Sequence, residues 1–468
     1  MYFQVFRFLP FVICFSIILF SCKKDKTLPA PSGLTITNIS DTSCSVSWSP
    51  VSGATGYKLT IATNASFLSP INGYNQLTIT NTSLNVTNLT PYTKYFVRVI
   101  AYNDQRDSDP LTGDFMTADA DGLVIVPWDN NKLYAFDARN GNVKWTFAGA
   151  SIFATPIIHD SVVYVGSTDG RVYALNVSDG SQKWRSAATT NAAMFTANPL
   201  IKNGVVYIGD YGGKCHAYNA ADGSSKWTYD IPSPYKNINS TPILNGNTIY
   251  FASYDGKIYA LDAGTGAYKW ATASTGNPIS SGMALVNDVI YVGASPKVYA
   301  FNATTGATKW VTPNPAFTQY FSSPTIANDI VFIGGTDGIM YAFKVADGSI
   351  SWSKVLGTGS IYSSPIYKNG IIYIGGGDGK LYALQSSTGN LIWQNSDAGS
   401  TKNIYSGPTI SQRAVYIGTL EGKVAAMDII TGTTKWIATI AGARFQASPC
   451  VITYKGDVYY PGLSGDVQ

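Results

Sequence analysis

Residues that could act as general acids, general bases or metal ligands are scarce in this sequence. The 468 residues contain 28 Asp and Glu and two His. The single Glu is Glu421, and the histidines are His159 and His216. Most hydrolytic and metal-dependent enzymes draw their proton-transfer groups and ligands from clustered His, Glu, Asp and Cys. We therefore expect no catalytic residues, no metal site and no cofactor, and we expect the chain not to be an enzyme.

The cysteines and the net charge exclude further classes of function. Cys44, Cys215 and Cys450 lie far apart in the sequence, a spacing that suggests neither a disulfide framework nor a metal site. We expect each to be buried as a small apolar side chain. The 32 Lys and Arg nearly balance the 28 acidic residues. Because nucleic-acid surfaces need clustered positive charge, we expect no nucleic-acid partner.

The N-terminus predicts export. Residues 1–21 hold Arg7 and then an apolar run up to Phe20, which is typical of a secretory signal and short for a membrane span. Leu19-Phe20-Ser21-Cys22 resembles a bacterial lipobox, in which Cys22 would carry the lipid that tethers the protein to a membrane. An ordinary signal peptide or a single-pass anchor is the alternative. The linker at residues 22–29 does not itself distinguish the inner from the outer membrane; we expect the outer membrane, with the protein facing the periplasm or the cell surface.

The elements that would have to position any site are strands. Gly, Tyr, Thr, Ser, Asn and Val dominate the composition, which favours an all-β fold. Residues 30–118 contain short alternating strands separated by turns, as in a β-sandwich. Val46-Ser47-Trp48 and the stretch from Leu89 to Val99 resemble a fibronectin type III domain. That resemblance implies that Trp48 lies in the core and that the Tyr95 hydroxyl bonds back to the preceding loop. We expect this module to be a spacer or interaction domain.

Residues 119–468 repeat. Eight tryptophans recur 39 to 43 residues apart, and each repeat contains up to four short strand patterns separated by turns such as Asp255-Gly256 and Thr265-Gly266. Asp-Gly and similar dipeptides are typical of tight hairpins, and Glu421-Gly422 is one of them. A period near forty with several strands per repeat predicts an eight-bladed β-propeller of four-stranded blades.

The stretch from Tyr259 to Trp270, Tyr-Ala-Leu-Asp-Ala-Gly-Thr-Gly-Ala-Tyr-Lys-Trp, resembles the tryptophan-docking motif of pyrroloquinoline-quinone-like β-propellers. The resemblance implies that each indole packs between neighbouring blades against small residues of the motif. These tryptophans would then be structural. They are Trp145, Trp184, Trp227, Trp270, Trp310, Trp352, Trp393 and Trp436.

The way the propeller closes stays open at this point. The first repeat lacks an innermost strand, and residues 447–452 offer one near the C-terminus. Residues 457–461 and 465–468 also resemble strands of a further repeat, which would compete with residues 122–128.

The resemblance leaves three classes of function. A quinone- and calcium-dependent dehydrogenase is disfavoured, because this chain has no adjacent cysteines and its one Glu lies in a predicted turn. A lipoprotein resembling the propeller subunit of the outer-membrane barrel-assembly machinery is the main alternative, although that subunit lacks the sandwich module. Our leading hypothesis is a non-catalytic cell-envelope or cell-surface lipoprotein that binds a protein or glycan through one propeller face. The sequence does not name that partner or the oligomeric state.

The loops that enter the innermost strands carry the candidate binding face, because they vary in length while the blades keep their period. Aromatic and amide side chains there could stack on and hydrogen-bond to a sugar or peptide. The alternative is that the aromatic residues simply plug the ring. The candidates, from stretches that include Phe317 to Phe321, are Asn191, Phe195, Tyr235, Lys236, Asn237, Phe317, Gln319, Tyr320, Tyr362, Lys402, Asn403, Tyr405, Arg444 and Phe445.

Overall fold

The computed structural model describes residues 27–118, 120–128, 132–149, 151–190, 193–313, 318–397 and 403–459, apart from the side chain of Trp128. The predicted signal segment and Cys22 lie outside these residues. The chain divides into two compact units, Met1–Ala118 and Asp119–Gln468. Every regular element in the described residues is a strand, so the all-β prediction is confirmed. Among them, no helix is long and apolar enough to cross a membrane.

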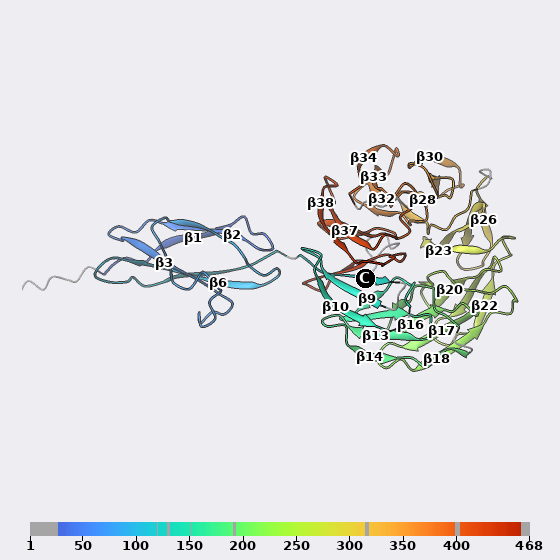
Figure 1. Cartoon of the computed structure of the whole chain (residues 1–468), viewed down its shortest axis with the longest axis horizontal. Helices are drawn as coiled ribbons and strands as arrows, with labels where there is room; N and C mark the ends of the chain where they lie inside the picture. The colour runs from blue at the N-terminus through green and yellow to red at the C-terminus, as the bar shows by residue number, and fades with distance from the viewer. Residues whose placement is uncertain are drawn as a thin grey trace, which may run out of the picture. The chain divides into compact units, whose positions relative to one another are not determined.

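The first unit is a sandwich of two antiparallel sheets (Figure 1). One sheet has the order β1-β2-β5 and the other β4-β3-β6-β7. The strands are β1 (Ser32–Thr37), β2 (Cys44–Ser49), β3 (Gly56–Ala62), β4 (Leu77–Ile79), β5 (Ser83–Val86), β6 (Lys94–Tyr102) and β7 (Leu111–Met116). Alternate side chains of β2 and β6 are buried between the sheets, as the period of two residues in a strand requires.

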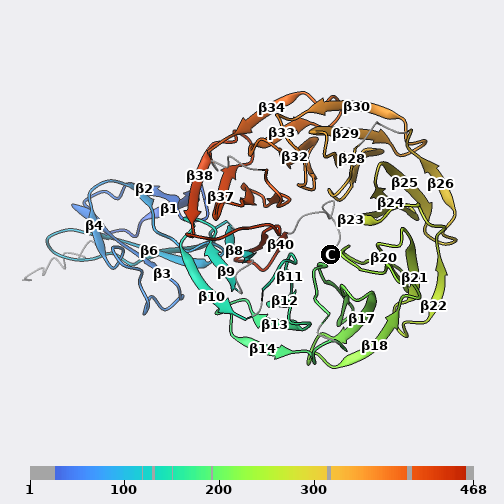
Figure 2. The ribbon, with the colours of Figure 1, turned by 45° about the vertical axis from the view of Figure 1, so that its right-hand side comes forward.

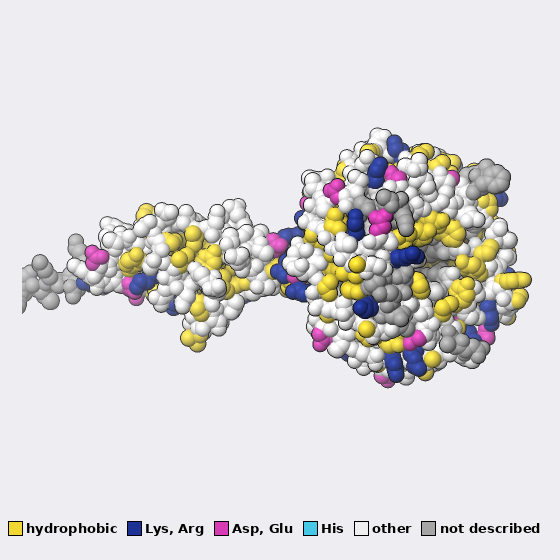
Figure 3. Space-filling view, in the orientation of Figure 1, with side chains coloured by type: hydrophobic (Ala, Val, Ile, Leu, Met, Phe, Trp, Pro, Cys, Tyr) yellow, Lys and Arg dark blue, Asp and Glu magenta, His cyan; other side chains and the backbone are white. Residues whose placement is uncertain are grey.

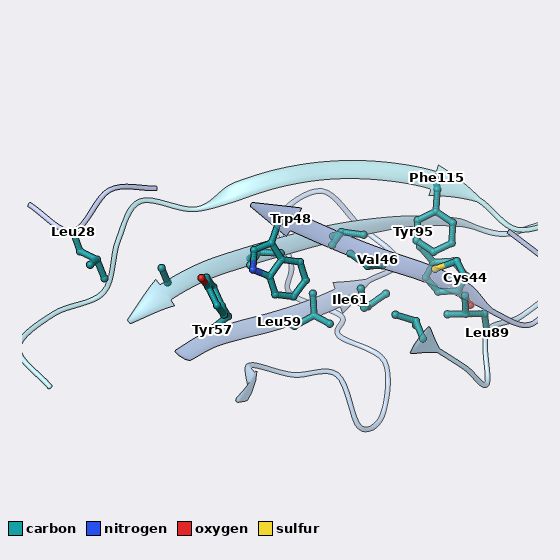
Figure 4. Packing of buried hydrophobic residues seen from close by; sticks show 14 residues of the cluster. Leu28, Cys44, Val46, Trp48, Tyr57, Leu59, Ile61, Leu89, Tyr95 and Phe115 are labelled. Atoms are coloured by element: carbon teal, nitrogen blue, oxygen red, sulfur yellow. The ribbon is translucent and has the colours of Figure 1, made fainter. Parts of the chain in front are cut away.

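The sandwich core contains the aromatic residues that the fibronectin resemblance singles out (Figure 4). Trp48 is buried and meets the Tyr57 ring edge to face, with ring centroids 5.3 Å apart. The Tyr95 hydroxyl accepts a hydrogen bond of 2.8 Å from the Thr90 backbone N–H in the preceding loop. Both implied roles are therefore present, and both are structural.

The second unit is an eight-bladed propeller, whose blades follow one another around a ring (Figures 1 and 2). Seven blades are four-stranded antiparallel sheets in chain order, and the first blade is five-stranded with the order β10-β9-β8-β39-β40. Blade 1 contains β8 (Asp121–Trp128), β9 (Lys132–Asp137), β10 (Val143–Ala148), β39 (Cys450–Thr453) and β40 (Val458–Tyr459).

Blades 2 to 8 each run from an innermost to an outermost strand. They are β11 (Ile157–His159), β12 (Val162–Gly166), β13 (Val172–Asn176), β14 (Gln182–Arg185); β15 (Leu200–Lys202), β16 (Val205–Gly209), β17 (Lys214–Asn219), β18 (Ser225–Asp230); β19 (Ile243–Asn245), β20 (Thr248–Ala252), β21 (Ile258–Asp262), β22 (Tyr268–Ala271); β23 (Ile279–Val286), β24 (Val289–Ala294), β25 (Lys297–Asn302), β26 (Thr308–Val311); β27 (Thr325–Ala327), β28 (Ile330–Gly334), β29 (Ile339–Lys344), β30 (Ile350–Val355); β31 (Ile366–Lys368), β32 (Ile371–Gly375), β33 (Leu381–Gln385), β34 (Leu391–Asn395); β35 (Thr409–Ile410), β36 (Ala414–Gly418), β37 (Lys423–Asp428) and β38 (Thr434–Thr439).

The C-terminal part of the chain closes the ring. Strand β39 pairs antiparallel with β8, with Cys450 opposite Ile125 and Val451 opposite Val124. Strand β40 then pairs with the other side of β39. The first of the two closures that the sequence left open is therefore the one adopted, and residues 458–459 extend blade 1 instead of displacing β8 (Figure 2).

The repeated tryptophans lie at the junctions between blades. Trp145 of β10 donates from Nε1 to the Val177 carbonyl of blade 2 over 2.8 Å. At the closure, Trp436 makes the same bond to the Ala138 carbonyl of blade 1 over 2.7 Å. The indole rests on a glycine of the next blade. A Cβ on Gly180 would lie 2.4 Å from the Trp145 ring, and the residue has a φ of +71°.

Candidate functional site

Seven of the eight loops that enter an innermost strand end in the same pattern, with a proline four residues after a buried side chain; the loop into blade 5 has Met283 in place of the proline. The buried side chain, here called the plug, is no more than 1% exposed in every blade. It packs where the second strand of the preceding blade ends, and a Cβ on Gly166 would lie 2.6 Å from that of Phe195. The plugs are Ile152, Phe195, Ile238, Ile279, Tyr320, Ile361, Ile404 and Phe445.

Three of the predicted face residues are plugs. Phe195, Tyr320 and Phe445 are buried between blades, so they are not available to a ligand and their assignment to the face is wrong. The reason is that large side chains at this position fill the space above a glycine or alanine of the neighbouring blade. The Tyr320 hydroxyl is buried without a hydrogen-bond partner in the described residues.

The residue directly after each plug is not buried like the plug itself. These positions, here called the loop-end ring, are partly or well exposed and lie directly before the innermost strands, close to the propeller axis. Side chains of neighbouring blades are in contact at Thr196 and Asn239 and at Phe321, Tyr362 and Tyr405. Members of the ring are Phe153, Thr196, Asn239, Ser280, Phe321, Tyr362, Tyr405 and Gln446.

Three consecutive members of the loop-end ring form an aromatic ladder. Phe321 and Tyr362 have ring centroids 5.6 Å apart. Tyr362 and Tyr405 are stacked, with centroids 4.3 Å apart and planes 5° from parallel. Burial and the neighbouring Tyr362 hydroxyl raise the pKa of Tyr405, so its hydroxyl keeps its proton at neutral pH. The ladder is therefore an aromatic surface that carries two hydroxyl groups.

Hydrogen bonds within and between blades hold these loops in place. On the side of the ring away from the ladder, the Thr196 hydroxyl donates to the Asn239 side chain over 2.8 Å. Two residues after the plug, Ser363 and Ser406 bond the backbone at the end of the second strand of their own blade. One residue further on, the Ser323 N–H donates to the Ser364 hydroxyl of the next blade over 2.9 Å. The face is therefore pre-organised, which lowers the entropic cost of binding.

The other predicted residues are distributed along the same loops. Tyr235 is 77% exposed at a loop tip, and the neighbouring Lys236 forms an ion pair with Asp230. The Asn237 and Gln319 carbonyls accept hydrogen bonds from turns of the adjoining hairpins. Asn403 is half-buried and Arg444 is exposed.

Asn191, Phe317 and Lys402 lie outside the described residues. Of the predicted set, Tyr362 and Tyr405 are brought into direct contact. Phe153, Thr196, Asn239 and Gln446 were missed, although each lies three residues before a proline, as Phe321, Tyr362 and Tyr405 do. That fixed distance separates loop-end positions from plugs.

Among the described residues, neither histidine nor the single Glu belongs to the loop-end ring. Glu421 lies in the turn between β36 and β37. His216 is buried, and its Nε2 lies 2.9 Å from Oδ2 of the fully buried Asp210, with the Phe195 and Tyr218 rings beside it. His159 is an exposed residue next to Asp160.

No group of three or more His, Cys, Asp or Glu suited to a metal occurs in the described ranges. Cys44, Cys215 and Cys450 are buried and unpaired, and burial raises the pKa of the Cys44 thiol to about 11. A bound quinone and calcium would need the vicinal cysteines and the carboxylate ligands that the dehydrogenase resemblance implies. The residues present do not fit that pair of groups.

Comparisons with known proteins agree with this architecture. The family model described as "Outer membrane protein assembly factor BamB" matches residues 93–276 and 254–459, and the fibronectin type III model matches residues 29–114. BamB of Yersinia pestis is 36% identical over 62 residues, which are 13% of this chain and 16% of that protein. The chain therefore spans about a sixth of the length of this curated relative.

Solved structures share the fold at lower identity. The crystal structure of BamB from Moraxella catarrhalis has a TM-score of 0.52 and 21% identity, covering 69% of this chain and 92% of that one. A europium-containing methanol dehydrogenase has a TM-score of 0.54 and 13% identity, covering 66% of this chain and 83% of that one. By its family match, this chain belongs to the family of the outer membrane protein assembly factor BamB, and it carries a fibronectin type III domain ahead of its propeller.

Proposed function

We propose that this protein is a non-catalytic cell-envelope lipoprotein that binds a protein or glycan through the loop-end ring of its propeller. The aromatic ladder carries the proposal. Phe321, Tyr362 and Tyr405 come from three separate blades, occupy the same repeat position and stack on one another while remaining partly exposed. Exposed, rigid aromatic side chains supply contact area at low entropic cost.

The surroundings of the ladder favour recognition over chemistry. The ring continues through Ser280, Asn239, Thr196 and Gln446, which offer hydroxyl and amide groups. The buried His216–Asp210 pair lies in the hairpin of blade 3, where blades 2, 4, 6 and 7 hold Tyr–Asp pairs such as Tyr259–Asp255. That pair therefore takes the place of a structural hydrogen bond of the repeat.

A triple variant tests the proposal. Phe321→Ala, Tyr362→Ala and Tyr405→Ala together should abolish capture of partners by crosslinking in whole cells and should abolish binding to arrayed soluble oligosaccharides. Tyr268→Ala is the control, because Tyr268 is an exposed aromatic residue on the outermost strand β22. Unchanged partners for a correctly folded triple variant would refute the proposal.

A role as an assembly factor for outer-membrane proteins is the second candidate. The family match over residues 93–459 favours it. Recovery of outer-membrane assembly proteins by the wild type and their loss in the triple variant would support this more specific role. A partner set made up of glycans or surface proteins would support the more general binding role instead.

A further inference from the structure

The outermost strand of each blade has an unpaired edge, and the residue just before the docking tryptophan shows how that edge is protected. Six of the eight blades carry an exposed lysine there. An edge lysine opposes edge-to-edge association, because a second strand would have to bury its charge. The lysines are Lys144, Lys183, Lys226, Lys269, Lys309 and Lys435.

In three blades this lysine has an acidic partner at the end of the third strand. Lys144 lies 3.4 Å from Asp137, and Lys269 lies 3.5 Å from Asp262. Lys435 lies 3.7 Å from Asp428. The outer rim of these blades is therefore charged and solvated.

Blade 7 has lost both members of the pair. Ile392 stands in place of the lysine and Gln385 in place of the acid. A β-bulge pairs Leu384 with Leu391 and Ala383 with Trp393, so Ile392 is the extra residue of the outermost strand. The side chains of Leu391 and Ile392 are both exposed. No charged residue occurs between Leu381 and Ser396.

Exposed aliphatic side chains also occur on the two neighbouring blades. Blade 6 begins its outermost strand with Ile350, and its lysine position is Ser351. Ile430 of blade 8 lies in the turn whose Gly432 contacts the Trp393 ring. Ile350, Leu391, Ile392 and Ile430, here called the apolar rim, are between 46% and 77% exposed. Figure 3 shows hydrophobic and charged side chains interspersed over the visible surface of the propeller.

We propose that the apolar rim binds the same rim of a second copy of this chain, with the two β34 edges antiparallel across a two-fold axis. Two features select this occupant. Unpaired backbone groups of a strand edge are satisfied by another free edge, and antiparallel pairing of identical strands is compatible with two-fold symmetry. The charge on each edge separates β34 from most other outermost strands. Two lysine-bearing edges would bring like charges together, whereas two β34 edges would bring no charged side chains together. This surface is independent of the loop-end ring.

Site-specific crosslinking in cells tests the pairing. The full chain is expressed with two different epitope tags, and a photo-crosslinking amino acid replaces Ile392. We expect an adduct that contains both tags. The control places the crosslinker at Lys226, the same repeat position in blade 3, and should give no such adduct. Absence of the two-tag adduct, equal adducts from both positions, or adducts only with lipid or another protein would overturn the proposal.

Restoring the repeat pattern should separate the copies. In this experiment the photo-crosslinking amino acid replaces Ile350. Ile392→Lys is expected to reduce the amount of the two-tag adduct at least tenfold. Gln182→Lys adds the same charge to the outermost strand of blade 2 and should leave the adduct unchanged. Leu391→Gln copies the residue found in blade 2 and provides a second variant if Ile392→Lys does not fold. An adduct that survives in a folded rim variant would contradict self-association.

Discussion

The glycine beneath each docked indole is where a single residue does most to hold the blades together. Gly180 combines a φ of +71° with a ring contact that leaves no room for a Cβ. Gly180→Ala should lower the free energy of unfolding by about 3 kcal/mol, because it adds a steric clash to the backbone strain of about 1–2 kcal/mol. Urea denaturation measures the change.

Gly204→Ala is the matched control for this substitution. Gly204 has a φ of +70°, but a Cβ added there would have no neighbouring atom within 4 Å. It should therefore show the backbone cost alone, about 1–2 kcal/mol. Equal losses for both variants would mean that the indole contact tolerates a methyl group and that the docking geometry contributes little.

A buried carboxylate gives the propeller a defined acid sensitivity. The hydrogen bond from Arg139 lowers the pKa of Asp137 to about 2, against the opposing effect of burial, and Lys144 contributes further. Because the folded-state pKa lies below the unfolded value of about 4, the stabilisation is complete above pH 4 and is lost as the pH falls toward 2. At pH 6, the free energy of unfolding of the wild type should be about 2 kcal/mol larger than that of Asp137→Asn. The difference should shrink toward pH 2 in urea titrations; a pH-independent difference would refute the ionic origin.

Strand β39 is the element on which ring closure depends. Its Val451 contributes to the core that joins blades 8 and 1, and its Cys450 and Ile452 contribute to the core that joins blades 1 and 2. Removing residues 448–468 should therefore expose β8 and abolish the cooperative thermal transition of the propeller. Removing only residues 460–468 keeps every described strand and should preserve the transition. A cooperative transition in the shorter chain would show that seven complete blades and a partial one suffice.

The strands and hairpins of each blade can be predicted from short sequence patterns, whereas the closure of the propeller ring cannot. Turn dipeptides such as Asp255-Gly256 and the period of the tryptophans were enough to predict the blades, because hairpins pair residues that are close in sequence. Pairing of Val124 with Val451 joins positions more than three hundred residues apart. Two competing C-terminal segments had similar strand patterns, so only the packing of whole strands separates them.

The candidate face was predictable only in part for a related reason. Phe195 and Tyr362 are both aromatic residues in equivalent loops, yet they occupy adjacent repeat positions that face the core and the axis respectively. A one-residue shift in an extended segment reverses the direction of the side chain. Aromatic composition therefore identified the loops, whereas the distance to the following proline was needed to assign the exposed residues.

At the scale of the whole molecule, the two units have separate hydrophobic cores. The sandwich core is centred on Trp48 and Tyr95, and the propeller core is divided among its blade junctions. The described residues of the sandwich carry no feature comparable to the loop-end ring. Recognition by the propeller and tethering by the N-terminus can therefore be tested independently.

Tethering rests on Cys22, which we propose as the lipid attachment site from the Leu19-Phe20-Ser21-Cys22 sequence. Cys22→Ser should abolish incorporation of labelled palmitate and release the protein from the membrane fraction, because it removes the thiol that would carry the lipid anchor. Cys14→Ser removes the other N-terminal cysteine and should leave both labelling and fractionation unchanged. Full membrane retention of an unlabelled Cys22→Ser protein would instead indicate that the apolar run up to Phe20 remains as an uncleaved anchor, and equal labelling of both variants would refute lipidation at Cys22.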